Sequence, residues 1–269
     1  MRSFSLLFAA IPLASAHVYA RAPDGLVKAN DFNYTDLGGP LNWYALNTSA
    51  NEACSNGHHQ SPIDIVTDAS DYTPVSSLNF TVSTVDSARF ENLGSGLEVV
   101  ITNGSLVANN KTFPLAQFHF HTPSEHRVNE EYFPMECHFV FQTEAKEIAV
   151  IAFLMELSPF GYTTPLFDHV FAHLDDIASP GTYTETDKLD FSGLIEHFNS
   201  HGVYSYNGSL TTPPCSENVP WYVSTEPLHV NVQQYRAVKS VLKFNSRYTQ
   251  NAIGQPNLLQ VSAKEVTKQ

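Results

Sequence analysis

The sequence is poor in basic residues. Lys and Arg together number 14 in 269 residues, whereas Asp and Glu number 27, and the formal net charge is −13. The Lys and Arg residues are scattered along the chain and form no basic cluster. Proteins that bind nucleic acid or anionic membranes usually present such clusters. The composition therefore argues against both kinds of partner, and we interpret the acidic excess as a contribution to solubility.

Long apolar segments are also missing beyond the N-terminus. The longest run, IAVIAFLMEL at 148–157, is well short of the roughly 20 residues that a membrane span needs. Residues 1–16, MRSFSLLFAAIPLASA, show the basic start, short apolar stretch and small-residue ending of a secretory signal peptide. We therefore expect a secreted, extracellular protein whose mature domain is 17–269, without a membrane span.

Cysteine is scarce as well. The chain contains three, which in an oxidising compartment permit one disulfide and leave one thiol. Secretion also makes each Asn-x-Ser/Thr sequon a candidate glycan acceptor. Any single sequon can remain unused, so we expect glycosylation at some of the six. They are Asn33, Asn47, Asn79, Asn103, Asn110 and Asn207.

Two common hydrolase motifs, HExxH and GxSxG, do not occur in the sequence, and neither do internal repeats or long linkers. Short segments with strand character dominate the middle of the chain, and a few helical patterns interrupt or follow them. The expected strands are 78–82, 97–102, 116–121, 136–141, 147–155 and 220–224, and the expected helices are 165–174, 191–198 and 231–243. This order predicts a single β-dominated α+β domain.

The stretch QFHFHTPSEH is unusually rich in histidine. Side chains alternate between the two faces of a strand, so Gln117, His119 and His121 share one face while Phe118 and Phe120 share the other. Two imidazoles on one face can converge on a single ion. Taken alone, this His-x-His pattern is also compatible with an ordinary half-exposed strand.

The next strand segment, MECHFVF, supplies a third imidazole. If this segment returns antiparallel to the first, His138 lies within about 5 Å of the other two histidines. Three neutral imidazoles without a ligating carboxylate or thiolate favour zinc, with water at the fourth position. His126 is an alternative third ligand, because Pro123 interrupts the strand before it and leaves its direction open.

Each histidine-bearing segment also carries a suitable hydrogen-bond acceptor. Gln117 and Glu136 each precede a candidate ligand, His119 and His138, by two residues on the same strand face. An oxygen in that place can accept the second N–H of the imidazole, which fixes the tautomer and raises the basicity of the ligand. A chance polar face does not require such an acceptor beside each histidine.

The same alternation bears on the cysteines. Cys137 lies on the face opposite Glu136 and His138, toward the expected core, which favours a buried free thiol. The disulfide is then expected between Cys54 and Cys215.

These motifs resemble the α-class carbonic anhydrases in their secreted form. The resemblance extends from Phe32 to about Pro227 and is specific, because several motifs occur in the family's order. They are FNYTDLGGPLNW (32–43), HHQSPIDI (58–65), QFHFHTPSEH (117–126), MECHFV (135–140) and YNGSLTTPPCSE (206–217). It implies one domain around a large, twisted, mostly antiparallel sheet with a few peripheral helices. It also implies zinc at the bottom of a conical cleft and a Cys54–Cys215 bridge.

The implied activity is the zinc-dependent, reversible hydration of CO2 to bicarbonate and a proton. By resemblance, His119, His121 and His138 bind Zn2+, and Thr211 with Glu125 orients the attack of zinc-bound hydroxide. The implied CO2 pocket is apolar, and Val140 is also expected in it because it shares the strand face of His138. The pocket residues are Val140, Val150, Leu210, Thr212, Val219 and Trp221, and Tyr34 is assigned to the water network near the metal.

The chain departs from the family pattern in two places. Ser95 occupies the position where fast members carry a proton-relaying histidine, so turnover is expected to depend on external buffer. Glu98 is a candidate substitute if it faces the cleft. The segment 250–257 lacks the family's arginine, so we assign it no role. An alternative function on the same fold is a catalytically silent binding domain.

Overall fold

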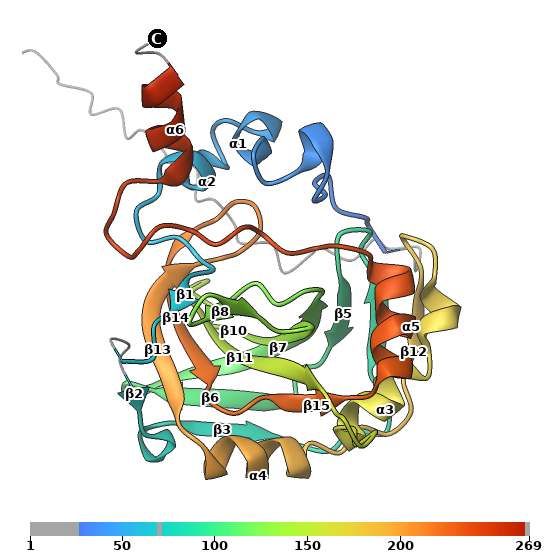
Figure 1. Cartoon of the computed structure of the whole chain (residues 1–269). Coiled ribbons are helices and arrows are strands. Elements are labelled where there is room, and N and C mark those ends of the chain that lie inside the picture. Colours follow the sequence, from blue (N-terminus) through green and yellow to red (C-terminus); the bar gives the residue numbers. More distant parts are fainter. Residues whose placement is uncertain (1–26, 69–71, 267–269) are drawn as a thin grey trace, which may run out of the picture.

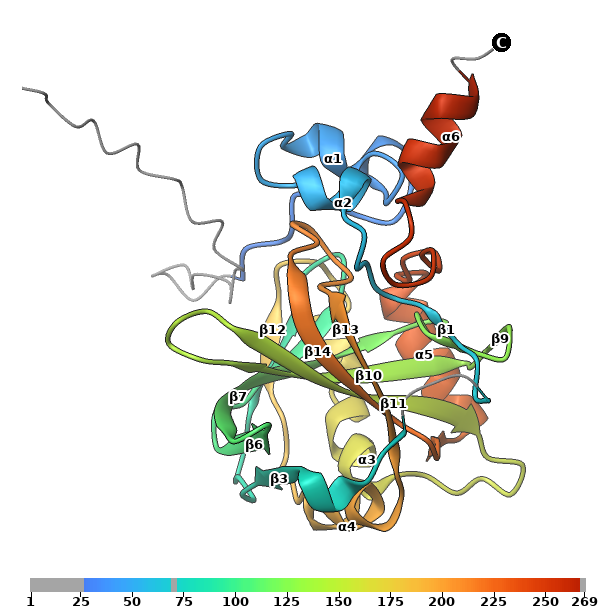
Figure 2. The same cartoon turned by 90° about the vertical axis from the view of Figure 1, so that its left-hand side faces the viewer.

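The computed structural model describes residues 27–68 and 72–266, so the predicted signal peptide at 1–16 lies outside the described residues. A 12-stranded sheet forms the centre of the molecule (Figure 1, Figure 2). Its main path runs β12-β4-β5-β7-β10-β11-β14-β13-β2, with β15 beside β11, and with β6 between β7 and β3. Most neighbours are antiparallel, although β11 pairs in parallel with β14 and β15. The prediction of a single α+β domain around a mostly antiparallel sheet is confirmed.

The strands of this sheet vary widely in length. They are β2 (Tyr72–Thr73), β3 (Asn79–Val82), β4 (Arg89–Asn92), β5 (Leu97–Val100), β6 (Gly104–Ala108), β7 (Lys111–His121), β10 (Met135–Gln142), β11 (Ile148–Leu157), β12 (Tyr183–Glu185), β13 (Val203–Ser209), β14 (Glu217–Ser224) and β15 (Leu228–Val230). A separate three-stranded sheet contains β1 (Asp64–Ile65), β8 (Arg127–Val128) and β9 (Glu131–Tyr132).

The helices are short and lie around the sheet. They are α1 (Trp43–Leu46), α2 (Glu52–Asn56), α3 (Pro165–Phe171), α4 (Ser192–Ser200), α5 (Val232–Leu242) and α6 (Leu258–Val266), with 3-10 turns η1 (Asp36–Gly38), η2 (Val75–Ser77) and η3 (Leu174–Ile177). All three predicted helices are present. The one expected at 165–174 ends earlier as α3, and η3 follows it.

Strands β7 and β10 form the centre of the sheet and separate a polar face from an apolar one. They pair antiparallel with His119 opposite His138 and Phe118 opposite Phe139. The phenylalanines are fully buried, and their rings stack with centroids 4.8 Å apart. Because side chains alternate, burying the aromatic rings on one face directs the imidazoles to the other face.

Strand β11 is apolar on both faces because both faces are covered. Ile151 and Phe153 belong to the main hydrophobic core. Val150 and Ala152 belong to a second apolar cluster that also contains Trp221 of the neighbouring strand β14. This double coverage explains why its sequence has no polar alternation.

Helix α5 has clear local reasons to begin where it does. The side chain of Asn231 accepts a hydrogen bond from the backbone N–H of Gln234, and the Gln234 side chain accepts one from the backbone N–H of Asn231. This reciprocal capping satisfies two backbone donors at the helix start.

In the described part of the chain, no helix has the length and hydrophobicity needed to cross a membrane.

The disulfide connects α2 to a distant part of the chain, and the segment after α5 is hydrogen-bonded to residues 58–62. Cys54 in α2 is bonded to Cys215 across 161 residues, whereas Cys137 is a buried free thiol, as predicted. After α5 the chain returns beside residues 58–62. The backbone N–H of Gly254 donates to the His58 carbonyl at 2.8 Å, and that of Gln250 donates to the Pro62 carbonyl at 2.9 Å.

Candidate metal centre

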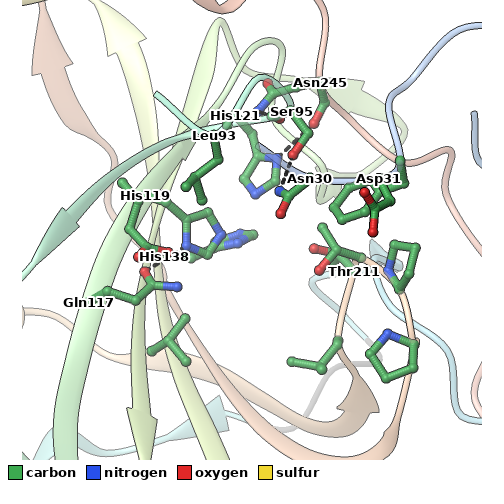
Figure 3. Close-up of a pocket in the computed structure, with 18 of the residues that line it drawn as sticks. Asn30, Asp31, Leu93, Ser95, Gln117, His119, His121, His138, Thr211 and Asn245 are labelled. Carbon is green, nitrogen blue, oxygen red and sulfur yellow. Dashed lines mark hydrogen bonds between the residues drawn. The ribbon is translucent and has the colours of Figure 1, made fainter. Parts of the chain in front are cut away.

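Three histidines converge at one point on the polar face of the sheet. His119 and His121 come from β7 and His138 from β10. Candidate ligand atoms of the three rings all lie within 4.8 Å of one another. The close-up shows them grouped at the wall of a cavity (Figure 3). The structure therefore brings together the three histidines that the strand alternation predicted.

A hydrogen bond to an oxygen acceptor orients each ring. His119 Nδ1 donates to Gln117 Oε1 at 2.8 Å, and His138 Nε2 donates to Glu136 Oε1 at 2.7 Å, as predicted. His121 Nδ1 donates to the backbone carbonyl of Asn245 at 2.8 Å. In each ring the second nitrogen is left to face the centre of the cluster. Such acceptors fix the tautomer that a metal ligand requires.

The cluster has the donor set of a zinc site. His121 Nε2 is buried and makes no hydrogen bond, although it faces the other two rings. Burial lowers the pKa of His121 to about 4, and burial together with the neighbouring histidines also lowers the pKa of His119. The rings are therefore neutral near pH 7, which is the form that binds a metal. Three neutral imidazoles with one open direction suit four-coordinate Zn2+.

Glu136 is the most heavily engaged carboxylate near the cluster. One oxygen accepts from both His138 and His126, and the other accepts the backbone N–H groups of Glu125 and His126 at 2.7 and 2.8 Å. Burial by itself raises the pKa of Glu136. The two histidines outweigh that effect and hold the pKa well below its usual value. Glu136 is therefore an anion at neutral pH, fixed by four donors.

His126 is not available as a ligand. Its Nδ1 bonds to Glu136 Oε1 at 2.6 Å and its Nε2 bonds to the Tyr206 hydroxyl at 2.7 Å. The ring also packs against Trp221, with centroids 4.9 Å apart. Since both nitrogens are engaged away from the cluster, the alternative that His126 is the third ligand is wrong.

Glu125 and Thr211 lie together at the edge of the cluster. Thr211 lies near the Glu125 carboxylate and acts on it as a side-chain donor that lowers its pKa. Glu125 is fully buried, and its Oε1 accepts the backbone N–H of Arg247 at 2.8 Å. Burial raises the pKa of Glu125 to about 7, against the opposing effects of His138, the Arg247 N–H and Thr211. Its other oxygen lies 3.5 Å from His121 Nε2, so this pair borders the open side of the cluster.

Two residues at the site were missed by sequence reasoning, Asn245 and Arg247. Asn245 acts through its backbone carbonyl, which every residue carries, so no sequence signal identifies it. Arg247 is 1% exposed, and its guanidinium donates to the Ser61 carbonyl and to Gln60 Oε1 at 2.8 and 2.9 Å. Arg247 lies three residues before the segment 250–257, which itself contains no arginine.

The cluster opens into a cavity of about 690 Å³. Its wall contains most of the predicted pocket residues, which are apolar except for Thr212. They are Val140, Val150, Leu210, Thr212 and Trp221. Val219 instead packs in the apolar cluster behind Trp221 and is not among the lining residues. Tyr34 lines the cavity on the side of the N-terminal segment, where its ring packs against Trp43.

Polar side chains also line the wall. They are Asn30, Ser95, Glu98 and Gln117. Ser95 is 7% exposed and accepts a hydrogen bond from the Asn30 side chain (Figure 3). Burial, followed by the charge of Glu91, raises the pKa of Glu98 to about 8. Glu98 lines the cavity, as its candidate role requires.

Comparison with known proteins places this site in a family. The family model of the eukaryotic-type carbonic anhydrases matches residues 38–260. The chain belongs to the eukaryotic-type, or α-class, carbonic anhydrase family. It is a carbonic anhydrase homologue with the three-histidine cluster that is typical of a zinc site in that family.

Individual relatives agree over most of the chain. A carbonic anhydrase from Neisseria gonorrhoeae is 32% identical over 244 residues, which is 90% of this chain and 92% of the relative. The solved structure of a fungal α-carbonic anhydrase from Aspergillus oryzae superposes with a TM-score of 0.86 at 61% identity, covering 88% of this chain and all of that one. The dioscorin DB3L of Dioscorea polystachya is 31% identical over 87% of this chain and 86% of its own length.

The ionisation of Glu136 gives a prediction about stability. The pKa of Glu136 in the folded protein is below the ordinary value of 4.5. The ionised carboxylate therefore contributes fully to the unfolding free energy above about pH 4.5, and this contribution is lost as the pH falls through the folded pKa. Glu136→Gln should lower the unfolding free energy of the metal-free protein by about 3 kcal/mol near pH 7, because buried donors lose their anion. Denaturant titrations from pH 7 to 3 should show this deficit narrowing in acid.

The exposed Glu144 provides the control. Glu144→Gln should leave the unfolding free energy within about 0.5 kcal/mol of the wild type at every pH. A Glu136→Gln protein as stable as this control at pH 7 would contradict the role assigned to the carboxylate.

Proposed function

We propose that the protein catalyses the reversible hydration of CO2 to bicarbonate and a proton, with Zn2+ as cofactor. The observation that carries the proposal is the convergence of three oriented, neutral imidazoles beside apolar side chains of the cavity and a buried Thr–Glu pair. His119 and His121 would hold the metal through Nε2, and His138 through Nδ1. Zinc bound there supplies Lewis-acid chemistry that makes water an effective nucleophile near neutral pH.

Thr211 is the residue that would orient this nucleophile. In its ionised form Glu125 would accept the proton of the Thr211 hydroxyl, which would leave the Thr211 oxygen as an acceptor. It can accept a hydrogen bond from the attacking water or hydroxide, which fixes the direction of the remaining lone pair toward carbon. The backbone N–H of Thr211 is available to a CO2 or bicarbonate oxygen. Fixed orientation of this kind lowers the entropic part of the barrier.

The apolar side chains of the cavity would hold CO2, which has no net dipole. Val140 and Leu210 line the cavity together with Val150 and Trp221. These side chains exclude water from the space next to the metal and make no competing hydrogen bond, apart from the indole N–H of Trp221. That N–H donates to the Ser209 carbonyl at 2.9 Å and so is turned away from a substrate.

The proton must leave past the polar side chains of the cavity. Thr212 and Tyr34 line the cavity and would contribute to a hydrogen-bonded water chain. Ser95, in the position of the relay, cannot accept and release a proton near pH 7 as an imidazole does. We therefore assign the final proton transfer to external buffer.

The metal requirement is tested by stopped-flow CO2 hydration of the purified protein. Chelation should reduce activity to background and added Zn2+ should restore it. His119→Ala should lose activity that zinc cannot restore, because one of three ligands is gone. His173→Ala, which changes a histidine that is not among the residues lining the cavity, is the matched control. Activity unaffected by both chelation and His119→Ala would instead favour the catalytically silent binding domain.

Proton transfer is tested by varying the buffer at fixed pH and ionic strength. Turnover should rise at least roughly tenfold between very dilute and concentrated imidazole buffer, because no residue at position 95 relays the proton. The rate constant kcat/KM should change little, since it does not include proton release. Equal turnover at both buffer concentrations would show that an internal group, with Glu98 the first candidate, replaces the histidine.

We also propose that the protein is secreted. The Cys54–Cys215 disulfide suits an oxidising compartment, and all six sequon asparagines are exposed. Peptide mapping of protein from the medium of a eukaryotic host should find an N-terminus near residue 17 and glycans on some of these asparagines. Retention inside the cell with an intact residue 1 would contradict this.

A further inference from the structure

The segment 28–34, here termed the N-terminal strap, forms one side of the cleft. Most of its residues line the cavity. Its C-terminal end is fixed by aromatic packing, since Phe32 and Tyr34 contact the buried Trp43 with ring centroids 5.5 and 5.6 Å apart. The other end must be held separately if the strap is to keep the shape of the cleft.

That end is held on the turn between β4 and β5. The backbone N–H of Asn30 donates to the Leu93 carbonyl at 2.9 Å, and the Asn30 side-chain amide donates to Ser95 Oγ (Figure 3). Ser95 is 7% exposed and lies between the strap and the sheet.

The same turn contacts the segment that orients a metal ligand. The side-chain amide of Asn245 reaches the Ser95 carbonyl at 3.4 Å and the Phe120 carbonyl at 2.9 Å. The backbone carbonyl of Asn245 accepts the hydrogen bond of His121. Ser95 is therefore a junction between the strap and the residues behind the metal centre.

We propose that Asn30 and Ser95 form a clasp that fixes the N-terminal strap as a wall of the cleft, so that Ser95 is a positioning residue. This deepens the proposed function and rests on it only for the activity measurement. The clasp uses the space in which a relaying histidine would stand. A histidine at position 95 would remove the hydroxyl that accepts the Asn30 amide, so we expect it to open the strap.

Hydrogen exchange of the zinc-loaded, full-length mature protein tests the clasp without relying on activity. Ser95→Ala should speed exchange of the amides in 28–34 about fivefold, the effect of losing one hydrogen bond of ordinary net strength. Ser95→Thr, which keeps the hydroxyl, should return exchange to the wild-type rate. Ser87→Ala removes an exposed serine hydroxyl that contacts Glu185 outside the cavity lining, and it should leave strap exchange unchanged.

Two further variants keep the test decisive if Ser95→Ala folds poorly. Asn30→Ala removes the donor from the other side and should speed exchange equally. Ser95→His should also speed it, because it removes the hydroxyl that accepts the Asn30 amide. Unchanged strap exchange in Ser95→Ala and Asn30→Ala, or failure of Ser95→Thr to restore it, overturns the clasp.

Parallel CO2 hydration assays separate the two proposals. Faster exchange of the strap amides in Ser95→Ala supports the clasp even if neither the wild type nor the variant hydrates CO2. Absence of CO2 hydration in both proteins would refute only the proposed function. If the enzyme is active, Ser95→His should remain buffer-dependent while its strap is open. A buffer-independent Ser95→His protein with wild-type strap exchange would overturn the clasp, because the strap would then be held without the Ser95 hydroxyl.

Discussion

The antiparallel pairing of β7 with β10 is the constraint on which the site depends. His119 lies opposite His138, and Phe118 lies opposite Phe139. A slip of one residue in either strand would turn its imidazoles into the core and its phenyl rings into the cleft. The cost of exposing stacked aromatic rings therefore holds the register of the metal ligands. The apolar core specifies the geometry of the polar site on the opposite face of the same two strands.

Polar groups behind the histidines connect the site to the rest of the fold. Glu136 accepts from His126 and His138, and His126 continues to Tyr206, whose hydroxyl contacts Ser61 at 2.8 Å. Every member is buried or nearly so, and in such surroundings an unpaired group is costly. The ligand orientation is therefore not a local property of two strands. It also depends on His126 and Ser61, which lie outside these two strands.

The parts of this site that depend on the alternation of side chains along a strand could be predicted from the sequence. Alternation placed the three imidazoles, the acceptors Gln117 and Glu136, and the buried Cys137 on the correct faces, because strand geometry leaves no other choice.

Asn245 and Arg247 could not be found in this way. Their contacts with His121 and Glu125 are made by backbone atoms, at sequence separations of 124 and 122 residues. Local pattern contains no information about which distant loop supplies a carbonyl or an amide.

The remaining differences have equally physical causes. His126 follows a proline, and only the positions of Glu136 and Tyr206 decide where its two nitrogens are satisfied. Val219 is assigned to the pocket by the resemblance to the family. It packs in the buried cluster instead, while the indole of Trp221 reaches the cavity.

The position of residues 245–247 near the C-terminal end of the sequence has a consequence for biosynthesis. On the ribosome, β7 and β10 can pair well before residues 245–247 emerge from the exit tunnel. Until those residues dock, His121 Nδ1 lacks the Asn245 carbonyl that accepts its hydrogen bond, and the Glu125 carboxylate lacks the donor N–H of Arg247. The nascent polypeptide can thus assemble its sheet early, while maturation of the catalytic centre waits for nearly complete translation.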